Sequence, residues 1–133
     1  DAAGNMAHTM ETFRLVREKC DVYSGEDALN FPILACGGAG VISVLSNIVP
    51  AEVKKLYTLV KAGKLAEAAA QNDKLLPLAN ACFVEVNPIP VKEAMNVMGY
   101  DAGVPRAPLT KIEDANREKL VAAMKAFGVE IKA

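Results

Sequence analysis

Gly37-Gly38-Ala39-Gly40-Val41-Ile42-Ser43-Val44 is the stretch that decides the fold of this chain. Its second half is a β-branched run typical of a fully buried parallel strand, and the glycines before it predict a tight turn into that strand. A second short strand is predicted over residues 20–24, bounded by Gly25. A helix predicted over residues 26–36 joins the two. The order strand–helix–strand is that of a parallel α/β sheet or barrel.

Further helices are predicted on both sides of this unit from the spacing of apolar residues. The first has Asn5 as its N-cap. Pro77 is expected to kink a later helix. Thr110 with Glu113 has capping-box spacing at the start of the last helix, which Gly128 ends. The predicted helices cover residues 5–19, 50–62, 65–83, 91–98 and 110–127.

Composition excludes several classes of protein. The 133 residues include 15 basic and 16 acidic side chains, and this near-neutral balance without a basic cluster argues against a nucleic-acid surface. No apolar run approaches the roughly 20 residues of a membrane-spanning helix, and the start has no signal-peptide pattern. Cys20, Cys36 and Cys82 lack CxxC spacing, which indicates reduced, mostly buried thiols in a reducing compartment.

Two parallel strands do not form a stable sheet alone, because they need cover on both faces and neighbours on both edges. The missing strands must therefore come from elsewhere. Two hypotheses remain: the sequence is part of a larger α/β chain, or it is a fragment that associates with a complementary piece. We favour the first, because a domain is ordinarily one continuous folding unit and split barrels are rare.

Residues 23–27 (YSGED) are the first candidate for chemistry. A parallel strand that ends in Ser-Gly places main-chain amides at the edge where ligands bind, and Gly25 would let a substrate approach closely. The alternative is a plain strand-to-helix turn in which Glu26 and Asp27 interact with the helix dipole. The glycines at residues 37–40 do not fit a phosphate-binding loop, because they precede a strand instead of following one.

Several other side chains could take part in chemistry, but the sequence favours a structural role for each of them. His8, the single histidine, is predicted to lie on a helix surface. Glu85 is predicted to make capping or interhelical hydrogen bonds from a helical segment. A solvated helix face is expected to carry Lys54, Lys55, Lys61 and Lys64, and the core is expected to contain Met95 and Met98.

Five stretches together resemble the dihydrodipicolinate synthase family, one of the pyruvate-dependent aldolases and lyases with an α/β fold, the (β/α)8 TIM barrel. They follow the expected order and are residues 1–5 (DAAGN), 23–27 (YSGED), 37–44 (GGAGVISV), 83–92 (FVEVNPIPVK) and 106–110 (RAPLT). The NPIPVK segment favours the synthases over the sialic-acid lyases of the same superfamily. The resemblance implies that the two strands are the seventh and eighth of the barrel. Residues 1–62 would be its last βα units, and residues 63–133 a C-terminal helical extension.

The resemblance also implies a reaction. The family condenses pyruvate with aspartate semialdehyde in lysine and diaminopimelate biosynthesis, through a Schiff base between pyruvate and a lysine that becomes an enamine. That lysine belongs to a Gly-Ile-Lys stretch expected just before Asp1, so this chain is expected to hold no catalytic residue and to be inactive alone. Lys54 and Lys92 are no substitutes, since neither lies at a strand end, and Tyr23 is not the family's proton-relay tyrosine. The resemblance implies no cofactor and no metal.

Three substrate-binding residues are carried over from the resemblance. The main chain of Ile42 would contact pyruvate, and Gly25 with Glu26 would shape the aldehyde side of the pocket. The expected partners are the rest of the barrel and further copies in a homotetramer or dimer in the cytoplasm, without nucleic acid or membrane. Alternatives are another pyruvate-dependent class I aldolase or lyase, a non-catalytic assembly fragment, or a nucleotide-binding α/β half.

Overall fold

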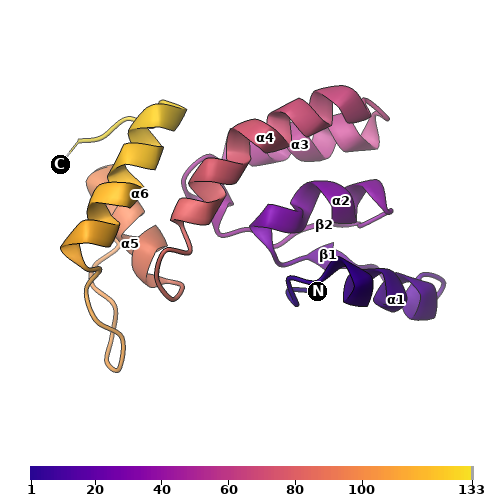
Figure 1. Cartoon of the computed structure of the whole chain (residues 1–133), viewed down its shortest axis with the longest axis horizontal. Coiled ribbons are helices and arrows are strands. Elements are labelled where there is room, and N and C mark those ends of the chain that lie inside the picture. The colour runs from indigo at the N-terminus through magenta and orange to yellow at the C-terminus, as the bar shows by residue number, and fades with distance from the viewer. Residues whose placement is uncertain (133) are drawn as a thin grey trace.

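The computed structural model describes residues 1–132 and has the predicted strand–helix–strand unit near its start (Figure 1). Its elements are α1 (Met6–Val16), β1 (Tyr23–Ser24), the 3-10 helix η1 (Asp27–Leu29), α2 (Asn30–Ala35) and β2 (Gly40–Val41). The two strands are parallel, with Tyr23 opposite Gly40 and Ser24 opposite Val41. Asn5 caps α1 as predicted, because its side-chain oxygen accepts from the His8 N–H at 3.1 Å.

Both strands are shorter than the sequence predicts. The Ile42 N–H still donates to Ser24 O at 2.7 Å, but the chain then turns into the 3-10 helix η2 (Leu45–Asn47). Within the described residues the side chain of Ile42 is 70% exposed, so the burial predicted for the whole β-branched run is not achieved by this part of the chain alone. Within residues 1–132 the sheet has two strands only, so no third strand covers this side chain.

The rest of the chain is helical, as predicted. The elements are α3 (Pro50–Lys61), α4 (Leu65–Ala81), α5 (Ile89–Val97) and α6 (Asp114–Phe127). Pro50 occupies the first turn of α3, where a missing N–H costs no hydrogen bond. Gly63 ends this helix with φ +73° and turns the chain into α4, which continues through Pro77.

The start of α6 corrects a prediction. The helix begins at Asp114, and Thr110 does not cap it. Instead, Glu85 accepts from the Glu113 N–H at 2.8 Å and from the Asn116 side chain at 3.0 Å. The interhelical role predicted for Glu85 is therefore confirmed, although this residue lies in the turn between α4 and α5 and not in a helical segment.

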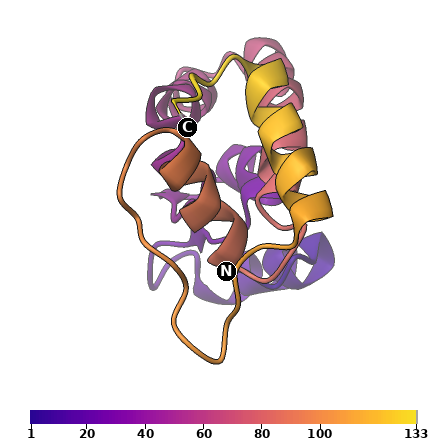
Figure 2. The ribbon, with the colours of Figure 1, turned by 90° about the vertical axis from the view of Figure 1, so that its left-hand side faces the viewer.

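A large apolar core joins α2 to the four later helices. Its most buried members include Leu56, Leu78, Leu120 and Met124. Because the core contains residues from both sides of residue 62, it does not separate residues 1–62 from residues 63–133, and that division stays a prediction. A smaller cluster of Phe13, Val22 and Ile33 connects α1 and α2 with the start of β1. Figure 1 shows the strands between these two helices and places α5 and α6 at the opposite end of the molecule, and Figure 2 views the molecule from that end.

Among residues 1–132, no helix combines the length and the apolar content that crossing a bilayer requires.

The core predicts unequal effects for two leucines of the same helix. Leu78→Ala removes a side chain that is 1% exposed, so it should lower the free energy of unfolding by about 2–5 kcal/mol. Leu65→Ala changes a side chain that is 50% exposed and should cost about 0.5 kcal/mol or less. Urea titration of both variants measures the difference, and equal losses would contradict the described packing of α4.

Candidate functional site

The ends of β1 and β2 form the candidate site, because both strands point the same way and finish side by side. Gly25, Glu26 and Asp27 follow the first strand, and Ile42 and Ser43 follow the second. Ligands of parallel α/β folds bind at this edge. The structure therefore brings the three predicted substrate-binding residues onto two adjacent loops.

Gly25 lies against the first residues of the chain. Its N–H donates to Asp1 O at 2.7 Å, and a Cβ added to it would stand 3.0 Å from Ala2 Cβ. The sequence predicts that a substrate approaches the main chain of Gly25 closely, and in this structure Ala2 occupies that position. A side chain at position 25 would push residues 1 and 2 away from the end of β1.

Glu26 is half-buried and begins the 3-10 helix η1. Its carboxylate accepts from the Ala28 N–H at 3.3 Å, as an N-capping residue does. Glu26 therefore has the helix-start role that the sequence offered as an alternative. The main chain of Ile42 is fixed to β1 through the hydrogen bond to Ser24.

Asp27 connects the two loops. Its side chain is 6% exposed and accepts from Asn30 Nδ2 at 2.8 Å, Ser43 Oγ at 2.5 Å and the Leu45 N–H at 2.8 Å. We call these four residues the Asp27 brace. Besides standing in the first turn of η1, where the sequence offered a helix-dipole role, Asp27 links the two loops.

Sequence reasoning missed this role because the partners lie 16 and 18 positions away. The available signal was the pattern itself: a carboxylate three residues after one parallel strand and a hydroxyl just after the next. Ser43 also accepts from the Ser46 N–H at 3.0 Å, and its carbonyl accepts from Ser46 Oγ at 2.7 Å. The loop after β2 is therefore held by several hydrogen bonds at once.

The cysteines differ in exposure. Cys82 is buried, and burial together with the negative charge of Asp27 raises the pKa of its thiol to about 12. A thiol that stays protonated is a poor nucleophile. Cys20 is exposed and Cys36 half-buried, so the prediction of mostly buried thiols is wrong for Cys20. Within residues 1–132 no group of three or more His, Cys, Asp or Glu side chains is arranged to hold a metal ion.

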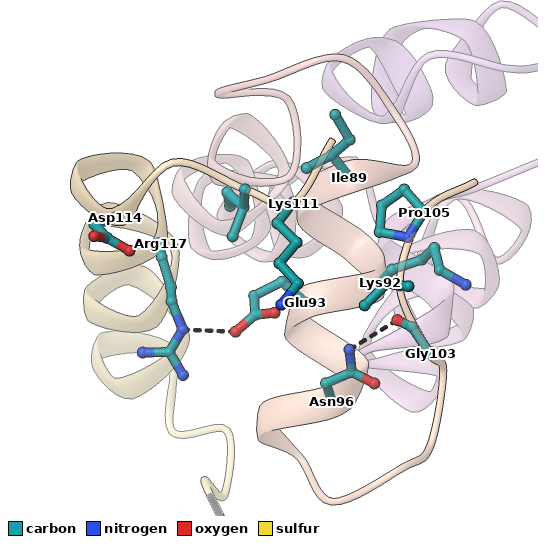
Figure 3. Close-up of a pocket in the computed structure, with 11 residues that line it drawn as sticks. Ile89, Lys92, Glu93, Asn96, Gly103, Pro105, Lys111, Asp114 and Arg117 are labelled. Atoms are coloured by element: carbon teal, nitrogen blue, oxygen red, sulfur yellow. Dashed lines mark hydrogen bonds and ion pairs between the residues drawn. The ribbon is translucent and has the colours of Figure 1, made fainter. Parts of the chain in front are cut away.

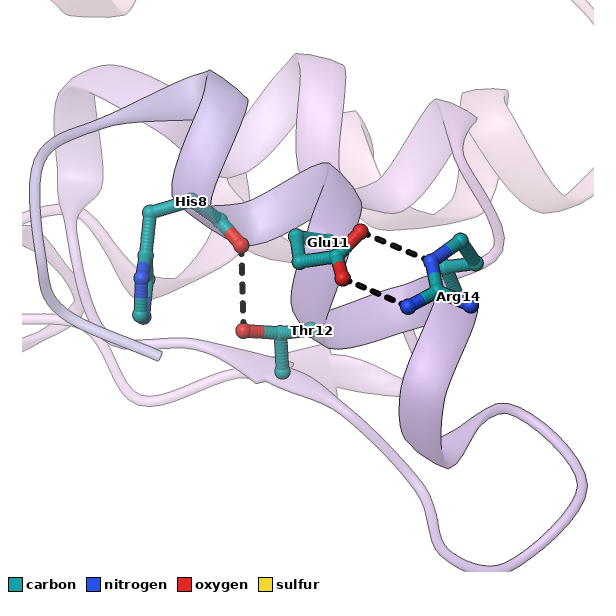
Figure 4. A network of polar contacts seen from close by, with 4 residues as sticks. All are labelled: His8, Glu11, Thr12 and Arg14. Atoms are coloured by element: carbon teal, nitrogen blue, oxygen red, sulfur yellow. Dashed lines mark hydrogen bonds and ion pairs between the residues drawn. The ribbon is translucent and has the colours of Figure 1, made fainter.

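His8 lies on the exposed surface of α1, as predicted (Figure 4). Its carbonyl accepts from Thr12 Oγ1 at 3.1 Å. Beside it, Arg14 donates twice to Glu11, at 2.8 and 2.6 Å, and these bonds lower the pKa of the Glu11 carboxyl. Exposed ion pairs of this kind contribute little to stability.

A cavity of about 290 Å³ lies between α5, α6 and the loop that joins them (Figure 3). Four of its polar side chains are engaged with the protein. Lys92 donates to Ala102 O, Asn96 Nδ2 donates to Gly103 O at 3.0 Å, and Arg117 Nε lies 2.6 Å from Glu93 Oε1. The first two contacts attach the loop to α5, and the third joins α6 to α5. Lys92 thus stands on a helix away from the strand ends, as the sequence predicts.

The burial of the cysteines predicts their reactivity. In native buffer near pH 8, a disulfide reagent such as Ellman's reagent should modify Cys20 first, whereas Cys82 should react only after unfolding in guanidinium. Mass spectrometry of the peptides that contain each cysteine measures the rates. Equal labelling of Cys20 and Cys82 in the native protein would contradict the packing around Cys82.

Comparison with known proteins agrees with this geometry. Residues 1–127 match the sequence profile of the Dihydrodipicolinate synthetase family. The chain is 46% identical to 4-hydroxy-tetrahydrodipicolinate synthase of Caldicellulosiruptor bescii over 99% of its own length and 44% of that protein. The chain therefore spans less than half of this curated relative.

Solved structures give the same result. The dihydrodipicolinate synthase of Aquifex aeolicus superposes with a TM-score of 0.93 at 34% identity, covering 100% of this chain and 45% of that one. The Acinetobacter baumannii enzyme, described as chloride-inhibited and complexed with pyruvate, superposes with a TM-score of 0.91 at 35% identity over 98% of this chain and 45% of that one. The predicted fold class is confirmed: two strands of an α/β barrel with their helices, followed by a helical extension. The chain belongs to the dihydrodipicolinate synthetase family.

Proposed function

We propose that the full-length protein is a 4-hydroxy-tetrahydrodipicolinate synthase, which condenses pyruvate with aspartate semialdehyde. The observation that carries this proposal is the 46% identity to a curated synthase over 99% of the chain. The solved relative that holds pyruvate supports pyruvate as the first substrate. The intermediate would be a Schiff base between pyruvate and a lysine, which loses a proton to give the enamine that attacks the aldehyde.

The nucleophile in this proposal comes from the strand before the described residues. Lys54 and Lys92 belong to α3 and α5, and Lys92 donates to the carbonyl of Ala102. Neither amine lies at the ends of β1 and β2. Following the family resemblance, we place the Schiff-base lysine immediately before Asp1, and we expect the 133 residues alone to be inactive.

This chain would supply the wall of the pocket. The main chain of Ile42 would contact pyruvate, while Gly25 and Glu26 would shape the aldehyde side. Supporting this assignment, all three stand on the two loops that follow the parallel strands. The N–H groups of Ile42 and Gly25 donate to Ser24 O and Asp1 O, and the Glu26 N–H donates to Ser24 Oγ.

The partners in the proposal are the rest of the barrel and further copies of the protein. Tyr23 and Ile42 are large exposed apolar side chains on or beside the strands, where barrel neighbours would cover them. Phe83, Tyr100 and Val104 are exposed on the helical extension and are candidates for contacts between subunits. An exposed, unpaired Cys20 suits the reducing cytoplasm.

Trapping with borohydride tests the reaction. Full-length protein treated with pyruvate and sodium borohydride should gain the mass of one reduced pyruvyl group on a lysine, because the reagent reduces the Schiff base irreversibly. The control omits pyruvate, and the 133 residues alone should show no adduct. Peptide mapping should place the adduct immediately before Asp1.

Three outcomes would count against the proposal. An adduct on Lys54 or Lys92 would refute the position of the nucleophile. A full-length protein that forms no adduct would refute Schiff-base chemistry altogether. An adduct without consumption of aspartate semialdehyde would indicate another pyruvate-dependent aldolase.

A further inference from the structure

The position of the Ile42 main chain depends on two anchors, one on each side. On the N-terminal side its own N–H donates to Ser24 O at 2.7 Å. On the C-terminal side the next residue, Ser43, donates its hydroxyl to Asp27, and the Leu45 N–H donates to the same carboxylate at 2.8 Å. Both anchors belong to the segment around the end of β1.

The backbone ladder does not extend far enough to provide the second anchor. The strand pairing ends with Ser24 opposite Val41, and the Gly25 N–H turns away to Asp1 O. Beyond Ile42, the hydrogen bonds between the loop after β1 and the loop after β2 are therefore those of the Asp27 side chain. A buried carboxylate that accepts three well-aligned donors holds them strongly, since the alternative is an unsatisfied buried charge.

The brace uses both carboxyl oxygens of Asp27 as hydrogen-bond acceptors. Oδ1 accepts from Asn30 and Ser43, and Oδ2 accepts from the Leu45 N–H. An amide at position 27 has one oxygen only. If its NH2 group replaces Oδ2, it faces the Leu45 N–H, and if it replaces Oδ1, the Ser43 hydroxyl loses its charged acceptor and can only accept from the amide. Asp27→Asn is thus a nearly isosteric change that removes the negative charge and weakens or breaks at least one link between the loops.

We propose that Asp27 is a positioning residue for pyruvate: through Ser43 and Leu45 it holds the main chain of Ile42 where the substrate contacts it. The proposal rests on the proposed function, in which Ile42 faces pyruvate. Asp27 does not touch the substrate in this proposal. Its loss should therefore weaken pyruvate binding much more than it affects the aldehyde.

Steady-state kinetics of the full-length protein tests this role. Asp27→Asn should raise the KM for pyruvate about tenfold or more, because small displacements of a contact group have effects of this size, and should change the KM for aspartate semialdehyde less than about twofold. Ser43→Ala should act in the same direction but less, since Leu45 and Asn30 still donate to the carboxylate. Ser43→Thr keeps the hydroxyl and should restore the wild-type KM.

Gln71→Met is the matched control. Gln71 is 5% exposed and donates from its side chain to Glu52 O at 3.1 Å and to Glu52 Oε2 at 2.8 Å, between α4 and α3. This variant loses buried hydrogen bonds away from the strand ends, so both KM values should remain unchanged. A pyruvate KM that changes equally in Gln71→Met and Asp27→Asn, or in neither, would show that Asp27 acts on stability only.

Hydrogen–deuterium exchange separates this proposal from the proposed function. Exchange at residues 42–46 should accelerate about tenfold in Asp27→Asn and Ser43→Ala, whereas residues in α4 should keep their rates. If the wild-type protein traps no pyruvate, the proposed function fails, and unchanged exchange at residues 42–46 would independently refute the brace. If Asp27→Asn does not fold, the Ser43→Ala and Ser43→Thr pair decides the question.

Discussion

The parallel pairing of β1 with β2 is the contact on which the candidate site depends, because it brings together loops from separate parts of the chain. The ladder is two residues long, and so short a ladder is marginal in water by itself. Here α1 and α2 pack around the start of β1 through Phe13, Val22 and Ile33. Asp27 then joins the loops beyond the ladder. Helix packing and one buried carboxylate together stabilise what two backbone pairs alone would not.

The electrostatics of that carboxylate suit a structural role. Its three donors are an amide side chain, a hydroxyl and a main-chain N–H, all of them uncharged. Salt screens exposed ion pairs but has little effect on buried hydrogen bonds of this kind, so the brace should persist across ionic strengths. The same negative charge adds to burial in keeping the Cys82 thiol protonated. Behind the strand ends, Asp27 therefore holds its neighbours through hydrogen bonds, and the Cys82 thiol is a poor nucleophile.

Local sequence information was enough for the helices but not for every boundary. The spacing of Val53, Leu56 and Val60 predicts α3 correctly, because a helix face is set by near neighbours. The start of α6 could not be predicted, since the carboxylate that accepts from its first residues belongs to Glu85, 28 residues before Glu113. The length of the strands and the role of Asp27 were missed for the same reason. Each depends on a partner that is distant in the sequence and adjacent only in the fold.

Ile42 shows how the local pattern and the site fit together. A β-branched run predicts burial, yet this side chain is 70% exposed while its main chain is hydrogen-bonded to β1. The two facts are compatible if further strands of the barrel cover the side chain and the main chain performs the function. A main-chain contact is insensitive to the identity of its own side chain, so its geometry must be controlled by neighbours. The fixed neighbours here are Ser24 on one side and Asp27 on the other. Under the proposed function, this chain therefore contributes to catalysis by setting the spacing between two loops more than by supplying a reactive group.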